Sequence, residues 1–179
     1  NLTKYVHDKA FDFGLFTGDI HTVVRAMDNV IDRTIYPLPE QEKEAKDKRR
    51  MGLGVTGLAN AAEMCGMPYA SKKFMKFTSQ VLETLRDYSY AASSTLAQEK
   101  GSFPLYEKDK YTEGEFFKTL SPWVQDQIKE FGIRNSHLTS IAPTGTISLT
   151  ADNVSSGIEP PFSLFYDRTI QEFDGHQIQ

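Results

Sequence analysis

The chain has 179 residues, of which 39% are hydrophobic and 25% are charged, and its formal net charge is −4. These values are typical of a globular protein with a core of its own, and they exclude a disordered tail and a basic nucleic-acid binder, so we expect no nucleic-acid partner. The sequence has no apolar run of the roughly 18 to 20 residues that a membrane span needs, no signal peptide at its start, and a single cysteine, Cys65. We therefore expect a cytoplasmic protein with no membrane partner and no internal disulfide.

Helical patterns fill residues 1–132. The first predicted helix begins at Asp19 as its cap and runs to about Ile35, before Pro37 and Pro39. Its expected apolar face consists of Ile20, Val23, Met27, Val30, Ile31 and Ile35. The charge run at residues 39–50 then predicts a solvated helical or loop face.

A second helix is expected at roughly Val55 to Cys65, and Gly66 and Pro68 end it. A long helix follows from Ser71 to about Lys100. Its apolar positions recur at nearly 3.6-residue spacing: Phe74, Thr78, Val81, Leu85, Tyr88, Ala92 and Leu96.

The last long helical pattern has Ser121 as N-cap, Pro122 at the first helical position and Gly132 as C-cap. Its apolar stripe consists of Trp123, Val124, Ile128 and Phe131.

Residues 133–179 have a different character. The β-branched alternation of "HLTSIA", residues 137–142, predicts a strand, and "FSLFYDRTIQEF", residues 162–173, predicts a second. A Thr/Gly/Ser turn and a short helix lie between them, which is a βαβ-like order. Two strands cannot cover their own edges, so we expect further strands from elsewhere.

The turn after the first of these strands reads Pro143-Thr144-Gly145-Thr146-Ile147-Ser148. A helix that starts near Thr146 would present unpaired N–H groups and the positive end of its dipole, with Gly145 allowing close approach, and this suits a phosphate. The alternative is that Thr144 and Thr146 merely cap a helix. Asn135 and Ser136 likewise fit a simple turn after Gly132.

Several segments together resemble the large, catalytic subunit of ribonucleotide reductase. They are "RRMGLGVTGLAN" (49–60), "RNSHLTSIAPTGTISLTADNVSSGIEPPF" (134–162), the helix in "SPWVQDQIKEFGIRN", and the opening "NLTKYV". The "APTGTIS…SSGIEP" form is most similar to the adenosylcobalamin-dependent class II enzymes, although some class I large subunits share it. The resemblance covers nearly the whole chain, which we expect to be a fragment from the C-terminal half.

The resemblance implies an α/β fold: a mostly helical fragment with a few strands, part of the family's ten-stranded α/β barrel. Residues 1–179 would be a single piece of that barrel domain. It implies that Pro143, Thr144, Gly145, Thr146, Ile147 and Ser148 hold the phosphates of a ribonucleoside di- or triphosphate. The full enzyme would reduce the ribose 2′-hydroxyl by thiyl-radical chemistry, with adenosylcobalamin as cofactor, a thioredoxin-type reductant, and the N-terminal half as partner.

The family's radical cysteine, its neighbouring Asn and Glu, and its reducing cysteines have no match here. We therefore expect no catalytic residue in this chain, an inactive isolated fragment, and structural roles for Ile158-Glu159-Pro160 and for Cys65 as a small buried hydrophobe. The histidines lack paired ligand spacing, so we expect no metal site. Two other hypotheses remain open, a stand-alone non-catalytic phosphate- or nucleotide-binding helical module, and a split-gene half that needs an N-terminal partner.

Overall fold

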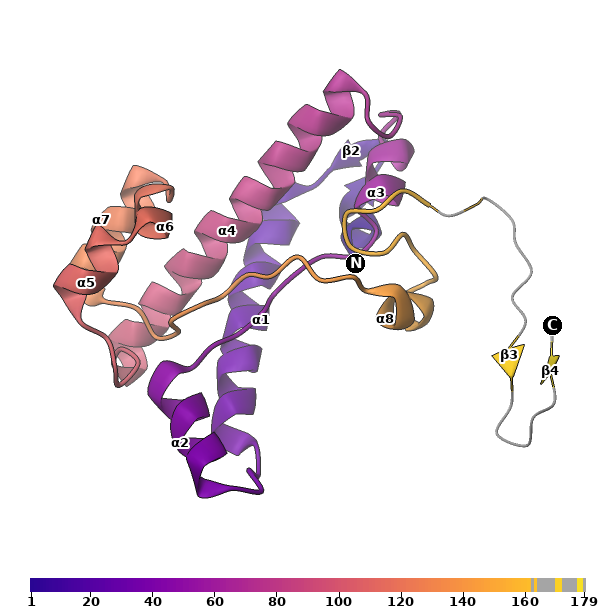
Figure 1. Ribbon diagram of the computed structural model, residues 1–179. Helices are drawn as coiled ribbons and strands as arrows, with labels where there is room; N and C mark the ends of the chain where they lie inside the picture. Colours follow the sequence, from indigo (N-terminus) through magenta and orange to yellow (C-terminus); the bar gives the residue numbers. More distant parts are fainter. Residues whose placement is uncertain (162, 164–169, 172–176, 179) are drawn as a thin grey trace.

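The computed structural model describes residues 1–161, 163, 170–171 and 177–178 (Figure 1). Helices dominate this part of the chain. They are the 3-10 helix η1 (Leu2–Tyr5) and α1 (Phe13–Arg33), α2 (Pro39–Lys48), α3 (Leu58–Met64), α4 (Lys72–Lys100), α5 (Lys108–Glu113), α6 (Glu115–Lys118), α7 (Pro122–Phe131) and α8 (Gly145–Thr150). The short strands form two antiparallel pairs, β1 (Val6–His7) with β2 (Ala10–Phe11) and β3 (Ile170–Gln171) with β4 (Gln177–Ile178).

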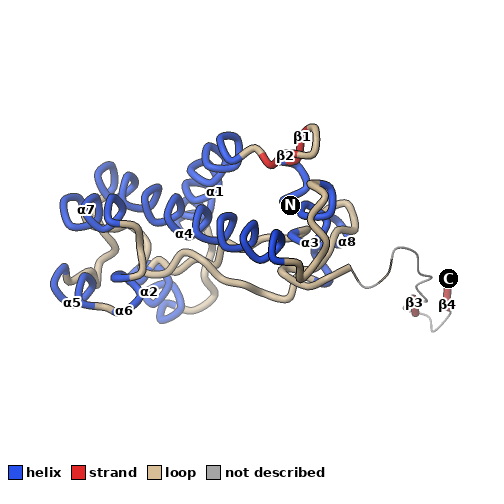
Figure 2. Tube along the Cα trace, turned by 90° about the horizontal axis from the view of Figure 1, so that it is seen from above, coloured by secondary structure: helices blue, strands red, loops and turns tan. Residues whose placement is uncertain are grey.

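The long helix α4 is the centre of the fold, and it packs against α1 and α7. Figure 2 shows the β1–β2 hairpin at the start of α1 and the helices α5, α6 and α7 gathered around one end of α4. The predicted bounds of α4 are confirmed, because the Ser71 hydroxyl accepts a hydrogen bond from the Phe74 amide at 3.1 Å and Gly101 ends the helix with φ +81°. Of the predicted stripe, Thr78 and Tyr88 are only half-buried.

The predicted start of α1 is wrong. Its cap is Asp12, whose carboxylate accepts from the Leu15 amide at 2.9 Å, whereas Asp19 lies inside the helix and accepts a hydrogen bond from the Tyr5 hydroxyl at 3.0 Å. The predicted face is also rotated from the true one. The residues that α1 buries are Phe16, Ile20, Val24 and Asp28, and the side chains of Val30 and Ile35 are 62% and 95% exposed.

The charge run divides into two parts. Helix α2 is solvated, as predicted, and its surface carries Lys–Glu and Lys–Asp pairs one turn apart. Arg49, however, is buried at 3% exposure and ends α2 in the left-handed conformation, with φ +48°. A basic residue was expected at the surface here, but Arg49 forms an ion pair with the buried carboxylate of Asp28.

Helices α3 and α7 lie close to their predicted positions. Helix α3 begins three residues later than expected, after Gly57 in the left-handed conformation, and Cys65 at its end is half-buried rather than buried. Of the stripe predicted on α7, Val124 and Ile128 are buried, whereas Trp123 and Phe131 are 48% and 39% exposed. The Ser121 hydroxyl does not cap α7 but donates to the Asp87 carboxylate at 2.5 Å.

The predicted strand at residues 137–142 is extended, but it forms only an isolated parallel bridge, Leu53 with Thr139. The Leu53 amide donates to the Leu138 carbonyl at 2.7 Å, and the Ser140 amide donates to the Leu53 carbonyl at 3.0 Å. Gly54 allows this close approach, because a Cβ there would lie 2.4 Å from the Ser140 carbonyl oxygen.

Most of the second predicted strand, residues 162–173, lies outside the described residues. Within the described ones, helix prevails and the strands do not close into a barrel, so the α/β expectation holds in its mostly helical form alone. None of the helices in this part of the chain combines the length and the apolar character that a bilayer span requires.

Candidate functional site

The hydroxyl-rich loop, residues 143–148, comprises the two residues before α8 and the first four residues of that helix. Thr144 precedes the helix, and the first helical hydrogen bond runs from the Ser148 amide to the Thr144 carbonyl at 2.8 Å. The N–H groups of residues 145–147 therefore have no partner within α8. Four residues of the loop are exposed, namely Pro143, Gly145, Thr146 and Ile147, so the start of α8 lies at the surface.

The hydroxyls of Thr144 and Thr146 do not cap α8, which contradicts the simple capping alternative. The Thr144 Oγ1 atom accepts a hydrogen bond from the Gly157 amide at 2.7 Å. Thr144 thus links the loop to residue 157. Its hydroxyl proton remains available for donation to a ligand. The Thr146 side chain stands in solvent.

Ser148 occupies a different position from the rest of the loop. Its side chain is 3% exposed, and its hydroxyl donates to the Gly145 carbonyl at 3.0 Å and lies 3.4 Å from the Ser156 hydroxyl. Ser148 therefore lies in the predicted loop, but its side chain points into the protein and not toward solvent.

The segment after α8 is anchored to α3 and to the first residue. The Asn60 side-chain oxygen accepts from the Ser155 amide at 2.7 Å, and the Ser155 carbonyl accepts from the Gly57 amide at 2.8 Å. The Asn1 side chain donates to the Ala151 carbonyl at 3.1 Å. These bonds fix residues 151–157 to α3 and to Asn1. Residues 143–148 contain no charged side chain.

A cavity of about 430 Å³ lies beside the loop, and its lining includes Gly52, Gly54, Thr56, Ser140, Thr144 and Ile147. Thr56 is 8% exposed, and its hydroxyl has no hydrogen-bond partner among the described residues. A buried hydroxyl without a partner costs free energy, so Thr56 places one unsatisfied polar atom in the wall of this cavity.

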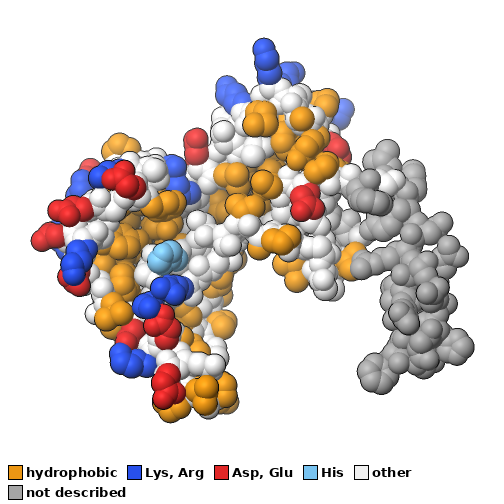
Figure 3. Space-filling view, in the orientation of Figure 1, with side chains coloured by type: hydrophobic (Ala, Val, Ile, Leu, Met, Phe, Trp, Pro, Cys, Tyr) orange, Lys and Arg blue, Asp and Glu red, His pale blue; other side chains and the backbone are white. Residues whose placement is uncertain are grey.

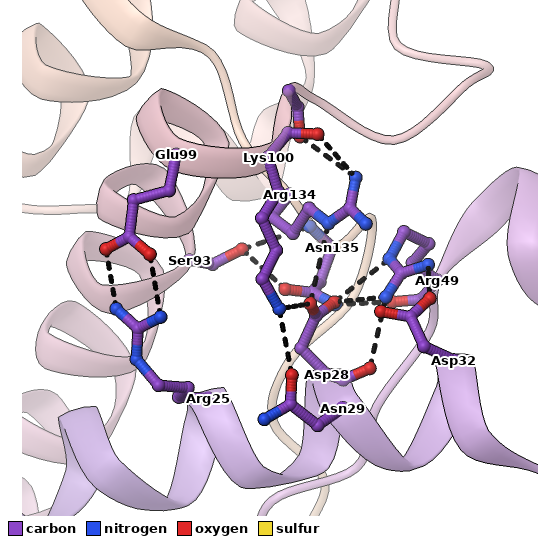
Figure 4. Close-up of polar contacts among 11 residues, drawn as sticks. Arg25, Asp28, Asn29, Asp32, Arg49, Ser93, Glu99, Lys100, Arg134 and Asn135 are labelled. Carbon is purple, nitrogen blue, oxygen red and sulfur yellow. Dashed lines mark hydrogen bonds and ion pairs between the residues drawn. The ribbon is translucent and has the colours of Figure 1, made fainter.

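A polar cluster lies where two extended segments, residues 51–55 and 137–142, begin (Figure 4). It is made of Asp28, Arg49, Ser93, Arg134 and Asn135. The Asp28 Oδ1 atom accepts from Arg49 Nε at 2.9 Å, from Arg49 Nη2 at 2.7 Å and from Asn135 Nδ2 at 2.9 Å. The Ser93 hydroxyl donates to the Asn135 side-chain oxygen at 2.9 Å. This cluster joins α1, α4 and both extended segments.

Burial by itself would raise the pKa of Asp28. Hydrogen bonds from Arg49 and Asn135, with the charges of Arg49 and Arg134, outweigh that effect and lower the pKa of Asp28 below its ordinary value. Burial by itself would lower the pKa of Arg49, but its hydrogen bonds to Asp32 and Asp28 and the charges of both carboxylates raise that pKa above its ordinary value. Asp28 is therefore a buried anion that several donors hold in its charged form.

Sequence reasoning missed this cluster. Asn135 was expected in a simple turn, yet it is fully buried. The available signal was the acid at position 28, one helical repeat after Ile20 and Val24, which marks a charged residue on a buried face. In the described part of the chain, no three His, Cys, Asp or Glu side chains converge as metal ligands.

Comparison with known proteins identifies the family. A sequence model of the ribonucleotide reductase barrel domain matches residues 1–178. The chain is 37% identical over 171 residues to a vitamin B12-dependent ribonucleoside-diphosphate reductase of Thermoplasma acidophilum, and 32% identical over 170 residues to a protein of the same name from Mycobacterium tuberculosis. Each alignment covers 95% of this chain.

A third relative is the ribonucleoside-diphosphate reductase subunit alpha of Chlamydia pneumoniae, which is 31% identical over 184 residues covering 90% of this chain. The chain spans about a fifth of the length of these relatives, namely 22% of the Mycobacterium protein, 20% of the Thermoplasma protein and 18% of the Chlamydia protein. Because the family model matches almost every residue, the chain belongs to the ribonucleotide reductase barrel-domain family.

Proposed function

We propose that the intact protein is a ribonucleotide reductase, which makes deoxyribonucleotides by thiyl-radical reduction of the ribose 2′-hydroxyl. The observation that carries this proposal is the family match over residues 1–178, together with relatives that are named reductases. In this proposal, residues 1–179 are one piece of a ten-stranded barrel, and residues 51–55 and 137–142 are two of its neighbouring strands. The catalytic cysteines would come from other parts of the protein, including an N-terminal half.

Within that enzyme, we assign the loop at residues 143–148 to the substrate's phosphates. The unpaired amides at the start of α8 and the Thr144 and Thr146 hydroxyls are neutral donors that a phosphate oxygen can accept from. Neutral donors leave no buried cation unpaired when the site is empty. The adjoining cavity would receive the sugar end of a ribonucleoside di- or triphosphate.

The contribution of this chain to the reaction is positioning. Fixing the phosphates orients the ribose toward the reacting groups, and such orientation lowers the barrier without any bond being made or broken by the loop. Two hydrogen bonds support this role. The Ser148 hydroxyl donates to the Gly145 carbonyl within the loop, and Thr144 accepts from the Gly157 amide beside it.

Adenosylcobalamin is the cofactor that we propose for the intact enzyme, because two of its relatives are named vitamin B12-dependent. When bound, it would supply the radical that starts the reaction. The described residues bring together no His, Cys, Asp or Glu group suited to a metal ion, so we assign none of them to its cobalt. A thioredoxin-type reductant would return the cysteines to their thiol form after each turnover.

The test of this function is an assay of the intact protein with CDP and CTP in the presence of adenosylcobalamin and dithiothreitol. Formation of the corresponding deoxycytidine phosphate supports the proposal and identifies the diphosphate or the triphosphate as substrate. A folded, cobalamin-loaded protein that forms neither product contradicts it.

A further inference from the structure

A lysine-rimmed pocket lies where the β1–β2 hairpin meets the end of α3 and the first turns of α4. Its volume is about 370 Å³, and it shares no lining residue with the cavity beside the loop at residues 143–148. Its rim carries Lys9, Lys73 and Lys76. This volume lies within the roughly 300 to 1,000 Å³ of small-molecule sites.

The floor of the pocket is aromatic. The ring of Phe11 lies 4.8 Å from the ring of Phe13 and 5.3 Å from that of Phe77, each in an edge-to-face arrangement. Phe77 is 5% exposed and belongs to the core, so the floor is rigid. Phenyl rings of this kind favour contact with a planar apolar group.

The lysines of the rim have no acidic partner. Among the described residues, Lys9, Lys73 and Lys76 form no ion pair, and neither does Lys72 beside them. Figure 3 shows basic side chains gathered at the end of the molecule where α4 begins. The whole chain has a net charge of −4, so this grouping of lysines does not follow from an overall excess of basic residues. Like charges that line one pocket repel one another.

Lys9 is held in an unfavourable backbone conformation. It forms the tip of the hairpin with Asp8, and their φ angles are +62° and +49°. Hairpin tips of this geometry favour Asn-Gly or Asp-Gly, because a side chain in the left-handed region is strained. A lysine at the usual glycine position points to a use for its ammonium group.

We propose that the lysine-rimmed pocket binds an amphipathic anion, with a planar apolar body and a phosphate, sulfonate or carboxylate group at one end. The apolar body lies on Phe11, Phe13 and Phe77, and the oxyanion lies among the ammonium groups of Lys9, Lys73 and Lys76. The compact ammonium group of lysine suits an oxyanion, and the bound charge relieves the repulsion within the rim. This site does not depend on the proposed reductase function.

The test uses a pair of probes that differ in charge, 8-anilinonaphthalene-1-sulfonate and its neutral counterpart N-phenyl-1-naphthylamine. Cys65 lines the pocket, so its alkylation by iodoacetamide in the intact protein, measured on the Cys65 peptide by mass spectrometry, reports occupancy. We expect the sulfonate to slow alkylation at a concentration about tenfold lower than the neutral probe, a difference of about 1.4 kcal/mol. Equal protection by both probes, or no protection by the sulfonate, contradicts the proposal.

Variants separate the pocket from general surface charge. Lys73→Glu and Lys76→Glu are each expected to weaken protection by the sulfonate about tenfold, whereas Lys72→Glu, on the same turn but outside the lining, is expected to leave it nearly unchanged. Lys9→Gly is expected to raise the unfolding midpoint, because strain is removed, and yet to weaken binding. An equal effect of Lys72→Glu, or a stabilised Lys9→Gly protein with unchanged binding, would overturn the assignment.

Discussion

Arg49 and Asp28 form a buried ion pair across 21 residues of sequence, with Arg49 Nη2 2.7 Å and Nε 2.9 Å from the same carboxylate oxygen. Their side chains are 4% and 0% exposed. The Asn135 amide donates to that oxygen as well. One carboxylate on α1 therefore holds the starts of both extended segments that lead to the cavity and the loop.

Removing the charge of Asp28 is expected to destabilise the protein strongly. In Asp28→Asn the shape is retained, but Arg49 loses its buried carboxylate partner and keeps only the half-exposed Asp32. Loss of one partner of a buried ion pair costs about 3 to 5 kcal/mol. The measurement is urea unfolding followed by circular dichroism.

The matched control for this variant is Asp32→Asn. Asp32 also contacts Arg49 at 2.7 Å, but its side chain is 42% exposed, so we expect a loss below about 1 kcal/mol. Equal losses in the two variants would show that burial of the Asp28 pair is not what stabilises the fold.

The stability of the folded protein is also expected to depend on pH through the titration of Asp28. Its pKa is lower in the folded protein than in the unfolded chain, where it is about 3.9. The stabilisation is therefore complete above that unfolded value and is lost as the pH falls through the folded value. Unfolding measured between about pH 5 and pH 2.5 should show a steeper decline for the wild-type protein than for Asp28→Asn, and parallel curves would contradict the assignment.

The bounds of the helices could be predicted from the sequence more accurately than the buried polar residues could. The bounds of α4 follow from Ser71, Gly101 and an uninterrupted apolar period, all local signals. The cluster around Asp28 could not be predicted in the same way, because its residues are polar and the partners of Asp28 are 21 to 107 residues away. Pattern reasoning assigns such residues to solvent unless a tertiary partner is known.

Close approach of the extended segments is expected to require Gly54. In Gly54→Ala the new Cβ would lie 2.4 Å from the Ser140 carbonyl oxygen, so the segments must separate, at a cost of about 1 to 3 kcal/mol. Thermal unfolding measures this loss. Gly18→Ala is the control, because a Cβ at Gly18 meets no atom within 4 Å and alanine favours a helix by about 0.5 to 1 kcal/mol; a stable Gly54→Ala protein would disprove the contact.

Thr146 and Ser148 are expected to differ in kinetics. Thr146→Ala removes an exposed donor from the proposed phosphate site, so KM should rise about tenfold while kcat stays nearly constant, in line with a hydrogen bond of about 1.5 to 3 kcal/mol to a charged group. Ser148→Ala removes a buried bond to the Gly145 carbonyl and should lower stability by about 1 kcal/mol with a smaller change in KM. Steady-state assays of the intact enzyme, paired with unfolding curves, test this, and a larger KM effect for Ser148→Ala would reverse the two roles.

The candidate site was only partly visible in the sequence. The order Thr-Gly-Thr after an extended segment suits either an anion loop or a helix cap, and the family resemblance favours the phosphates of a nucleotide. The inward direction of Ser148 and the bond from the Gly157 amide to Thr144 depend on how residues 155–157 return beside the loop, which no local pattern specifies.

We propose that residues 143–148 hold the phosphates of a ribonucleotide, and hydrogen–deuterium exchange in the intact protein tests this assignment. Amides of residues 145–147 should exchange more slowly with CDP or CTP than with cytidine. The slowing should be lost in Gly145→Val, in which the new Cβ meets no atom of the protein within 4 Å. Unchanged exchange in this peptide, under conditions where equilibrium dialysis shows the nucleotide bound, would contradict the claim.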